Sequence, residues 1–226
     1  MAPAHRGRDW APVRTGGHDI VLGSRDETRA SEAAGLLNGR LTAPTSGLVT
    51  GAVNEKAADV ADVVVLTVPY QGHDELARGL RPHLTGKLVI SCVNPLGFDK
   101  QGPFGLDLGP TSAAEQAQEL LPESRVVGAF HHLSAVLLIG ETNQLEHEDV
   151  LVCGNDREAK QVVMDLAATV TGHAGIDAGA LRLARQLEPL TAVLISINTR
   201  YKVRAGVAIA GVPRAPRHVA GRWYER

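Results

Sequence analysis

Val63-Val-Val-Leu-Thr-Val68 is an almost wholly apolar run, rich in β-branched residues and without apolar–polar alternation. A strand with one solvated face alternates apolar and polar residues, whereas a strand buried on both faces does not. The run therefore predicts a strand inside a parallel sheet that is covered by helices on both sides. Leu88-Val-Ile-Ser91 has the same character and predicts a second buried strand.

Short apolar runs alternate along the chain with longer amphipathic segments. Strands are predicted at 20–22, 47–50, 63–68, 88–91, 125–130, 150–153 and 175–178. Helices are predicted at 27–37, 54–61 (with Asn54 as N-cap), 74–80 (ending before Pro82), 111–121, 157–169 and 181–204 (broken or bent near Pro189). Such alternation implies right-handed β-α-β crossovers, so the predicted fold class is α/β with a doubly wound parallel sheet.

Composition excludes several classes of function. The 226 residues hold 23 Lys and Arg against 25 Asp and Glu, a net charge of −2, which argues against a nucleic-acid binder because such a protein needs a basic face. No apolar stretch approaches the roughly 18 residues of a membrane-spanning helix. No Cys/His cluster has zinc spacing, so no metal is expected. The expected compartment is the cytoplasm.

The predicted strand at 20–22 is followed by Gly23-Ser24-Arg25 and then by a helix. In dinucleotide-binding sheets an acidic residue at this strand end accepts from the 2′-OH of NAD, whereas a hydroxyl with Arg suits the 2′-phosphate of NADP. Arg29 lies one helical turn after Arg25, so both guanidinium groups can reach one phosphate. The alternative is a plain turn followed by a solvated helix face.

Two further strand ends carry residues typical of ligand sites. Thr67-Val-Pro-Tyr70 and Asn94-Pro95 follow buried strands, and ligands of open α/β sheets bind at such carboxyl ends. Simple turns are the alternative.

His131-His132 follows a third strand, and neighbours on an extended chain point to opposite faces, so we expect one His in the crevice rather than a two-His metal site.

Six stretches together resemble the NADPH-dependent F420 reductases, also called F420H2:NADP oxidoreductases, of the actinobacterial type. The stretches run collinearly over about residues 17–212: Gly17-His-Asp-Ile-Val-Leu-Gly-Ser-Arg25, Leu66-Thr-Val-Pro69, Asn94-Pro-Leu-Gly-Phe-Asp-Lys-Gln-Gly-Pro103, Ala129-Phe-His-His-Leu-Ser-Ala135, Val150-Leu-Val-Cys-Gly-Asn-Asp156 and Arg200-Tyr-Lys202. The resemblance implies a Rossmann-like NADP-binding domain at 17–180, a helical C-terminal part at 181–212, and a homodimer. It also implies hydride transfer between NADP(H) and the deazaflavin coenzyme F420, without a metal or a nucleophile.

The resemblance also implies which residues contact the cofactors. Ser24, Arg25 and Arg29 match the group that binds the 2′-phosphate. Tyr70 and Asp74 match positions that line the NADP site. Leu96 and Ala135 match crevice positions near the nicotinamide. Gly206 matches a position that contacts the deazaflavin.

The chain departs from the family at its start. The family begins with a buried strand and a G-x-G-x-x-G turn that cradles the pyrophosphate, and no such motif occurs in these 226 residues. We expect the first strand to be missing, residues 1–16 and 213–226 to be poorly ordered, and activity to be impaired. Two alternatives stay open: an NADPH-dependent imine or keto-acid reductase with His131 or His132 as proton donor, and a non-catalytic dimerising fragment.

Overall fold

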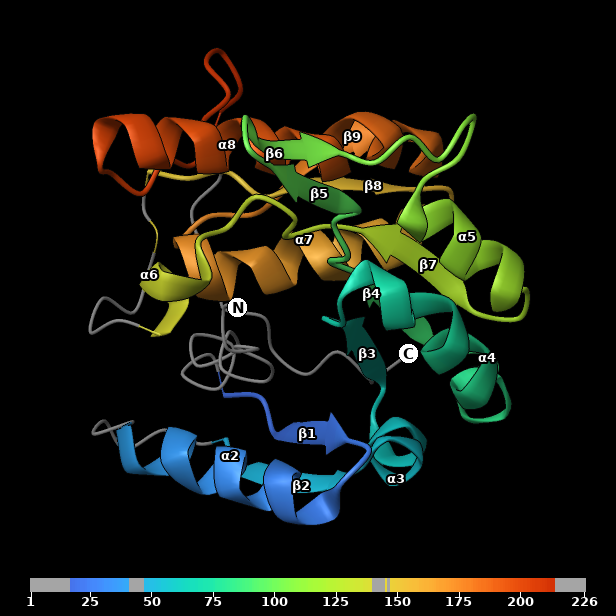
Figure 1. The fold of residues 1–226 in the computed structure, drawn as a ribbon. Coiled ribbons are helices and arrows are strands. Elements are labelled where there is room, and N and C mark those ends of the chain that lie inside the picture. The colour runs from blue at the N-terminus through green and yellow to red at the C-terminus, as the bar shows by residue number, and fades with distance from the viewer. Residues whose placement is uncertain (1–16, 41–46, 140–144, 146, 214–226) are drawn as a thin grey trace.

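The main sheet has five strands in the order β3-β4-β7-β8-β9 (Figure 1). The computed structural model describes residues 17–40, 47–139, 145 and 147–213. The strands are β3 (Val63–Leu66), β4 (Leu88–Ser91), β7 (Arg125–Gly128), β8 (Leu151–Gly154) and β9 (Ile176–Gly179). All neighbouring pairs are parallel except β7 with β8, which confirms an α/β fold with a mainly parallel sheet.

Helices cover both faces of this sheet. On one face, Val89 and Val126 pack with α4 (His73–Leu84) and α5 (Ala113–Leu120). On the other, Ile90 and Val127 pack with α6 (Ala135–Ile139) and α7 (Arg157–Thr171). Successive residues of each strand thus enter opposite cores, which is why these strands show no alternation in the sequence.

A smaller parallel sheet precedes the main one. It pairs β1 (Ile20–Ser24) with β2 (Val49–Val53) and carries α2 (Glu27–Arg40) and α3 (Asn54–Val60). Gly51 is required here, because a Cβ at this position would overlap the backbone of α2 at Ala30 and Ser31. Leu22 and Val49 form its core with Ala34 and Leu37.

The two sheets are neighbours without sharing a described strand. Ile20 of β1 packs against the same core cluster as Val63 and Val65 of β3. Among the described residues, β1 pairs only with β2, and β3 pairs only with β4. The expectations for residues 1–16 and for the tail from 214 onward lie outside the described part of the chain.

The C-terminal elements lie over one end of the sheet. The helical turn η2 (Leu181–Leu183) leads into α8 (Ala184–Tyr201), which packs against the hairpin of β5 (Leu96–Asp99) and β6 (Gly102–Gly105). Asp99 shapes the hairpin turn, since its Oδ1 accepts from the N–H groups of Gln101 (2.7 Å) and Gly102 (3.1 Å).

Several local predictions were wrong. The sheet is not wholly parallel, since β8 runs against β7. In the described part of their connection, α6 spans only about 7 Å, too short to carry the chain back along the sheet. Helix α4 continues past Pro82 to Leu84, because Leu80 and Leu84 are buried on one face. Asn54 is the first helical residue rather than the N-cap, which is Val53.

The hairpin of β5 and β6 was not predicted, and α8 runs through Pro189 as one helix. Of the helices in the described ranges, none combines the length and apolar character needed to cross a bilayer.

Candidate cofactor-binding site

The carboxyl ends of three parallel strands meet at one edge of the main sheet. β3, β4 and β7 lie side by side and end there. Tyr70 follows β3, Leu96 follows β4, and Ala135 follows β7 as the first residue of α6. Leu96 and Ala135 are both half-buried. The structure therefore brings these three predicted residues to the edge where ligands of open α/β sheets bind.

Side-chain hydrogen bonds hold the chain after β4 against the chain after β7. The Asn94 Nδ2 group donates to the His131 carbonyl at 2.7 Å, and the Thr191 hydroxyl of α8 donates to the same oxygen at 2.8 Å. The segments that carry Leu96 and Ala135 are thus fixed to each other and to α8.

Ser24, Arg25 and Arg29 lie at the end of β1 and the start of α2. The Asp26 N–H donates to Ser24 Oγ at 3.2 Å, which leaves the Ser24 hydroxyl proton free to donate elsewhere. The Asp26 carboxylate accepts from the N–H groups of Thr28 (2.9 Å) and Arg29 (3.4 Å), and so caps α2. Arg25 and Arg29 are exposed.

This donor set fits a phosphate better than a ribose hydroxyl. It offers one hydroxyl and two guanidinium groups at the positive end of a 14-residue helix. Of the two neighbouring carboxylates, that of Asp26 is engaged in capping and that of Glu27 lies 3.7 Å from Lys56 Nζ. These residues lie at the end of β1 and the start of α2, and among the described residues the sheet of β1 has no strand pairing with the main sheet.

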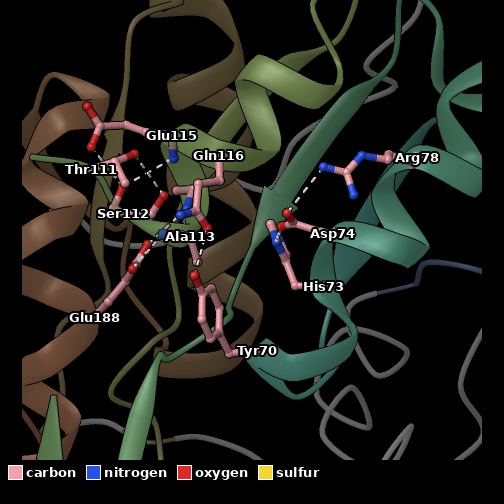
Figure 2. Close-up of polar contacts among 11 residues, drawn as sticks. Tyr70, His73, Asp74, Arg78, Thr111, Ser112, Ala113, Glu115, Gln116 and Glu188 are labelled. Atoms are coloured by element: carbon pink, nitrogen blue, oxygen red, sulfur yellow. Dashed lines mark hydrogen bonds and ion pairs between the residues drawn. The ribbon is translucent and has the colours of Figure 1, made fainter. Parts of the chain in front are cut away.

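Tyr70 and Asp74 lie in the segment after β3, where η1 (Tyr70–Gly72) leads into α4 (Figure 2). The Tyr70 hydroxyl donates to Gln116 Oε1 of α5 at 3.1 Å, and its ring stacks on His73 with centroids 6.3 Å apart. The Asp74 carboxylate lies 3.0 Å from His73 Nδ1 and 3.5 Å from Arg78 Nη2. The Asp74 side chain is half-exposed, so it also faces solvent.

Two charged residues of α8 hold the start of α5, and Figure 2 shows one of them, Glu188. The Glu188 carboxylate accepts from the N–H groups of Ala113 and Ala114, each at 2.9 Å. Arg185 donates two bonds to the Glu115 carboxylate, at 2.7 Å and 2.6 Å. Burial raises the pKa of the Glu188 carboxyl to about 7, although the two N–H donors oppose this shift. The Arg185 hydrogen bond lowers the pKa of Glu115.

A cavity of about 180 Å³ lies between α8 and the chain that leads into α5. Its lining includes Pro95, Leu106, Thr111, Arg185, Glu188 and Pro189. Pro95, which follows β4, and three residues of α8 line the same cavity, so a ligand in it would touch both segments.

His131 and His132 are both buried, whereas the sequence predicted one in a crevice and the other packed or solvated. Burial lowers the pKa of His131 to about 3. Burial also lowers the pKa of His132. His132 Nε2 donates to the Asp149 carbonyl at 2.6 Å. Within the described ranges, no group of three or more His, Cys, Asp and Glu residues could hold a metal ion.

Gly206 lies in the segment after α8, which is bound to Asp149. The Asp149 N–H donates to the Val207 carbonyl, and the Ile209 N–H donates to Asp149 Oδ2, both at 2.7 Å. A Cβ at position 206 would overlap the buried carboxyl of Glu148. Because β8 is antiparallel to β7, its first end lies at the edge where β7 ends, so Gly206 is brought to the same edge as Ala135.

Sequence reasoning missed Gln116, Arg185 and Glu188. Each lies on an amphipathic helix, where a Gln, Arg or Glu is usually a solvated surface residue. The one available signal was the unusual position of Glu188 directly before Pro189 in an apolar segment.

Comparisons with known proteins agree with this arrangement. Residues 11–95 match the family model described as NADP oxidoreductase, coenzyme F420-dependent. The F420-dependent NADP reductase of Methanocaldococcus jannaschii is 38% identical over 201 residues, which cover 85% of this chain and 88% of that protein. The F420-dependent NADP reductase of Methanothermobacter thermautotrophicus is 36% identical over 202 residues, covering 87% of this chain and 86% of that protein.

Solved structures show the same fold. A protein from Arthrobacter sp. FB24, proposed to be an F420-dependent NADP reductase, superposes with a TM-score of 0.74 at 23% identity and covers 90% of this chain and 96% of its own. A pyrroline-5-carboxylate reductase from Coxiella burnetii superposes with a TM-score of 0.57 at 15% identity, covering 86% of this chain and 64% of its own. The identities to the curated reductases, over most of both chains, show that this chain belongs to the F420-dependent NADP reductase family.

Proposed function

We propose that this protein is an oxidoreductase that transfers a hydride between NADP(H) and coenzyme F420. The observation that carries the proposal is the combination of family membership with a hydroxyl and two arginines at the end of β1. Bound NADPH would supply a hydride from its nicotinamide C4, and the deazaflavin ring would accept it at C5. The protein binds and orients the two rings and excludes water, since the cofactors carry the chemistry.

In this proposal Ser24, Arg25 and Arg29 bind the 2′-phosphate of NADP(H). Tyr70 and Asp74, at the end of β3, line the rest of the NADP site. Leu96, Ala135 and Gly206 lie at the edge where the nicotinamide and the deazaflavin would stack. The fit is supported by the small and apolar side chains of Leu96 and Ala135, which leave a flat ring room to approach.

The absence of a G-x-G-x-x-G motif from the sequence supports a weak grip on the pyrophosphate. We therefore propose weak but measurable NADPH binding that depends on the 2′-phosphate contacts.

The imine or keto-acid reductase alternative receives less support. It needs a proton donor, and His131, with a pKa of about 3, is neutral near neutral pH. A non-catalytic fragment is also less supported, since the similarity to the curated reductases extends over 85% of the chain.

The remaining expectations enter the same proposal. A homodimer is supported by exposed apolar side chains on the hairpin and α8, among them Phe98, Phe104 and Val193. Sedimentation would test it. A division into an NADP-binding domain at 17–180 and a helical part at 181–212, a cytoplasmic location and the lack of a nucleic-acid partner complete the proposal.

The test of the function is spectroscopic. Mixing the 226-residue chain with F420 and NADPH should bleach the visible absorbance of the deazaflavin, and NADH should do so far more slowly. Bleaching at the rate of an enzyme-free control would contradict the proposal, as would reduction of a small cyclic imine without reduction of F420.

A further inference from the structure

One hydrogen bond crosses from the end of β3 to helix α5 (Figure 2). The Tyr70 hydroxyl donates to Gln116 Oε1 at 3.1 Å, between residues 46 positions apart. Tyr70 is half-buried, and its ring stacks on the fully buried His73 with an interplanar angle of 22°. The ring is therefore held on one face by His73 and at its hydroxyl by Gln116.

Gln116 itself has a fixed position. Its backbone N–H donates to the Ser112 carbonyl at 2.9 Å in the first turn of α5. The Ser112 side chain caps this turn by accepting from the Glu115 N–H at 3.1 Å. The Glu188 carboxylate accepts from the N–H groups of Ala113 and Ala114, and Arg185 donates to the Glu115 carboxylate. The turn that carries Gln116 is thus fastened to α8 by Glu188 and Arg185.

We propose that Gln116 is a positioning residue for NADP(H) binding: it holds the Tyr70 ring at the end of β3, in the orientation that the cofactor meets. This inference rests on the proposed function, which places Tyr70 in the NADP site. It links the C-terminal helix α8 to the cofactor through α5, since Glu188 and Arg185 of α8 hold the first turn of α5, which carries Gln116.

A merely structural Gln116 would stabilise α5 and nothing more. The two roles differ in what they predict for a pair of substitutions. If Gln116 acts through the Tyr70 hydroxyl, removing either partner should have the same effect on NADPH affinity, and removing both should add nothing further. If Gln116 only supports the helix, Tyr70→Phe and Gln116→Leu should have independent effects.

The experiment measures NADPH affinity by fluorescence for the full chain and for Tyr70→Phe, Gln116→Leu and the double variant. Loss of one neutral hydrogen bond predicts a roughly 5-fold weaker affinity in each single variant and the same value in the double variant. Gln116→Glu keeps an acceptor oxygen at the same reach and should restore most of the affinity.

Gln118→Leu is the matched control on the same helix. Gln118 Nε2 donates to the carbonyls of Leu121 (3.1 Å) and Ser124 (2.9 Å), so this variant should lower the melting temperature. It should leave NADPH affinity within about 2-fold of wild type, since Gln118 makes no contact with Tyr70 in these bonds.

The outcomes separate the two proposals. Equal NADPH affinity in wild type and Gln116→Leu would overturn the role of Gln116, as would additive losses in the double variant. NADPH binding without F420 reduction would overturn the proposed function alone, because the comparison of NADPH affinity among the single and double variants still tests the role of Gln116. Absence of NADPH binding by the wild-type chain would overturn both.

Discussion

The Asn94 side-chain amide donates to the His131 carbonyl at 2.7 Å, and this bond joins the chain after β4 to the chain after β7. The two segments carry Leu96 and Ala135, which lie where the reacting rings are proposed to stack. Asn94 Oδ1 has no hydrogen-bond partner within the described part of the chain. The amide therefore serves the contact with His131 alone.

Asn94→Ala should reduce turnover by separating these two segments. The lost bond should lower the free energy of unfolding by about 1–2 kcal/mol. Thr191→Val is the matched control, because Thr191 donates to the same carbonyl from α8. Turnover should fall further in Asn94→Ala than in Thr191→Val, and equal turnover in both would contradict the special role of Asn94.

Arg25→Ala should weaken NADPH binding much more than NADH binding, because only NADPH carries the 2′-phosphate. A charge-assisted contact of this kind contributes roughly 1.5–3 kcal/mol. Fluorescence titration with both cofactors measures the difference. Arg157→Ala, which removes an exposed arginine at the start of α7, is the control. An equal loss of NADPH and NADH affinity in Arg25→Ala would refute the assignment of the 2′-phosphate site.

Ala135→Leu should hold the two rings apart and slow hydride transfer. A displacement of about 1 Å can cost roughly 100-fold in rate, while affinity for 2′-AMP should not change. Val136→Leu is the matched control, since Val136 is the next residue and is 54% exposed. Wild-type turnover in Ala135→Leu would identify Ala135 as an ordinary packing residue.

Glu188→Gln should change how stability depends on pH. Burial raises the pKa of Glu188 to about 7 in the folded protein, above its ordinary value of 4.5. A raised pKa means that the folded chain binds the proton more tightly than the unfolded chain does. The stabilising contribution is therefore fully present below about pH 4.5 and is lost as pH rises through about 7.

Denaturant unfolding at a series of pH values measures this effect. Relative to Glu188→Gln, the wild type should lose stability as pH rises through this range. Glu115 and Arg185 also face this site; the lowered pKa of Glu115 acts in the opposite direction at acid pH and is present in both proteins. Glu119→Gln, an exposed change on α5, should match the wild type. Parallel curves for wild type and Glu188→Gln would show that Glu188 does not titrate in this range.

The sequence predicted the elements whose signal is local. The apolar runs at 63–68 and 88–91 contain β3 and β4. All four residues of β4 are buried, whereas three of the four residues of β3, at the edge of the described sheet, are half-buried. Ser24 was placed correctly at the end of a strand, and Asp26, two residues later, caps the next helix.

The relationships that the sequence did not reveal are long-range. The antiparallel direction of β8 depends on the length and path of a connection rather than on the residues of the strand. The bond between Tyr70 and Gln116 joins positions with no common motif or periodicity. Glu188 could not be distinguished from a solvated helix residue until its contact with the start of α5 was seen.

The most direct test of the account follows the hydride itself. NADPH labelled with deuterium at nicotinamide C4, prepared separately for each face of the ring, would be mixed with F420 and the full chain. Mass spectrometry and NMR of the reduced deazaflavin would locate the label. We predict that one of the two labelled forms delivers deuterium to C5 and that Arg25→Ala slows this transfer without changing its position. Reduced deazaflavin without deuterium at C5 from either labelled form would contradict direct hydride transfer by this protein.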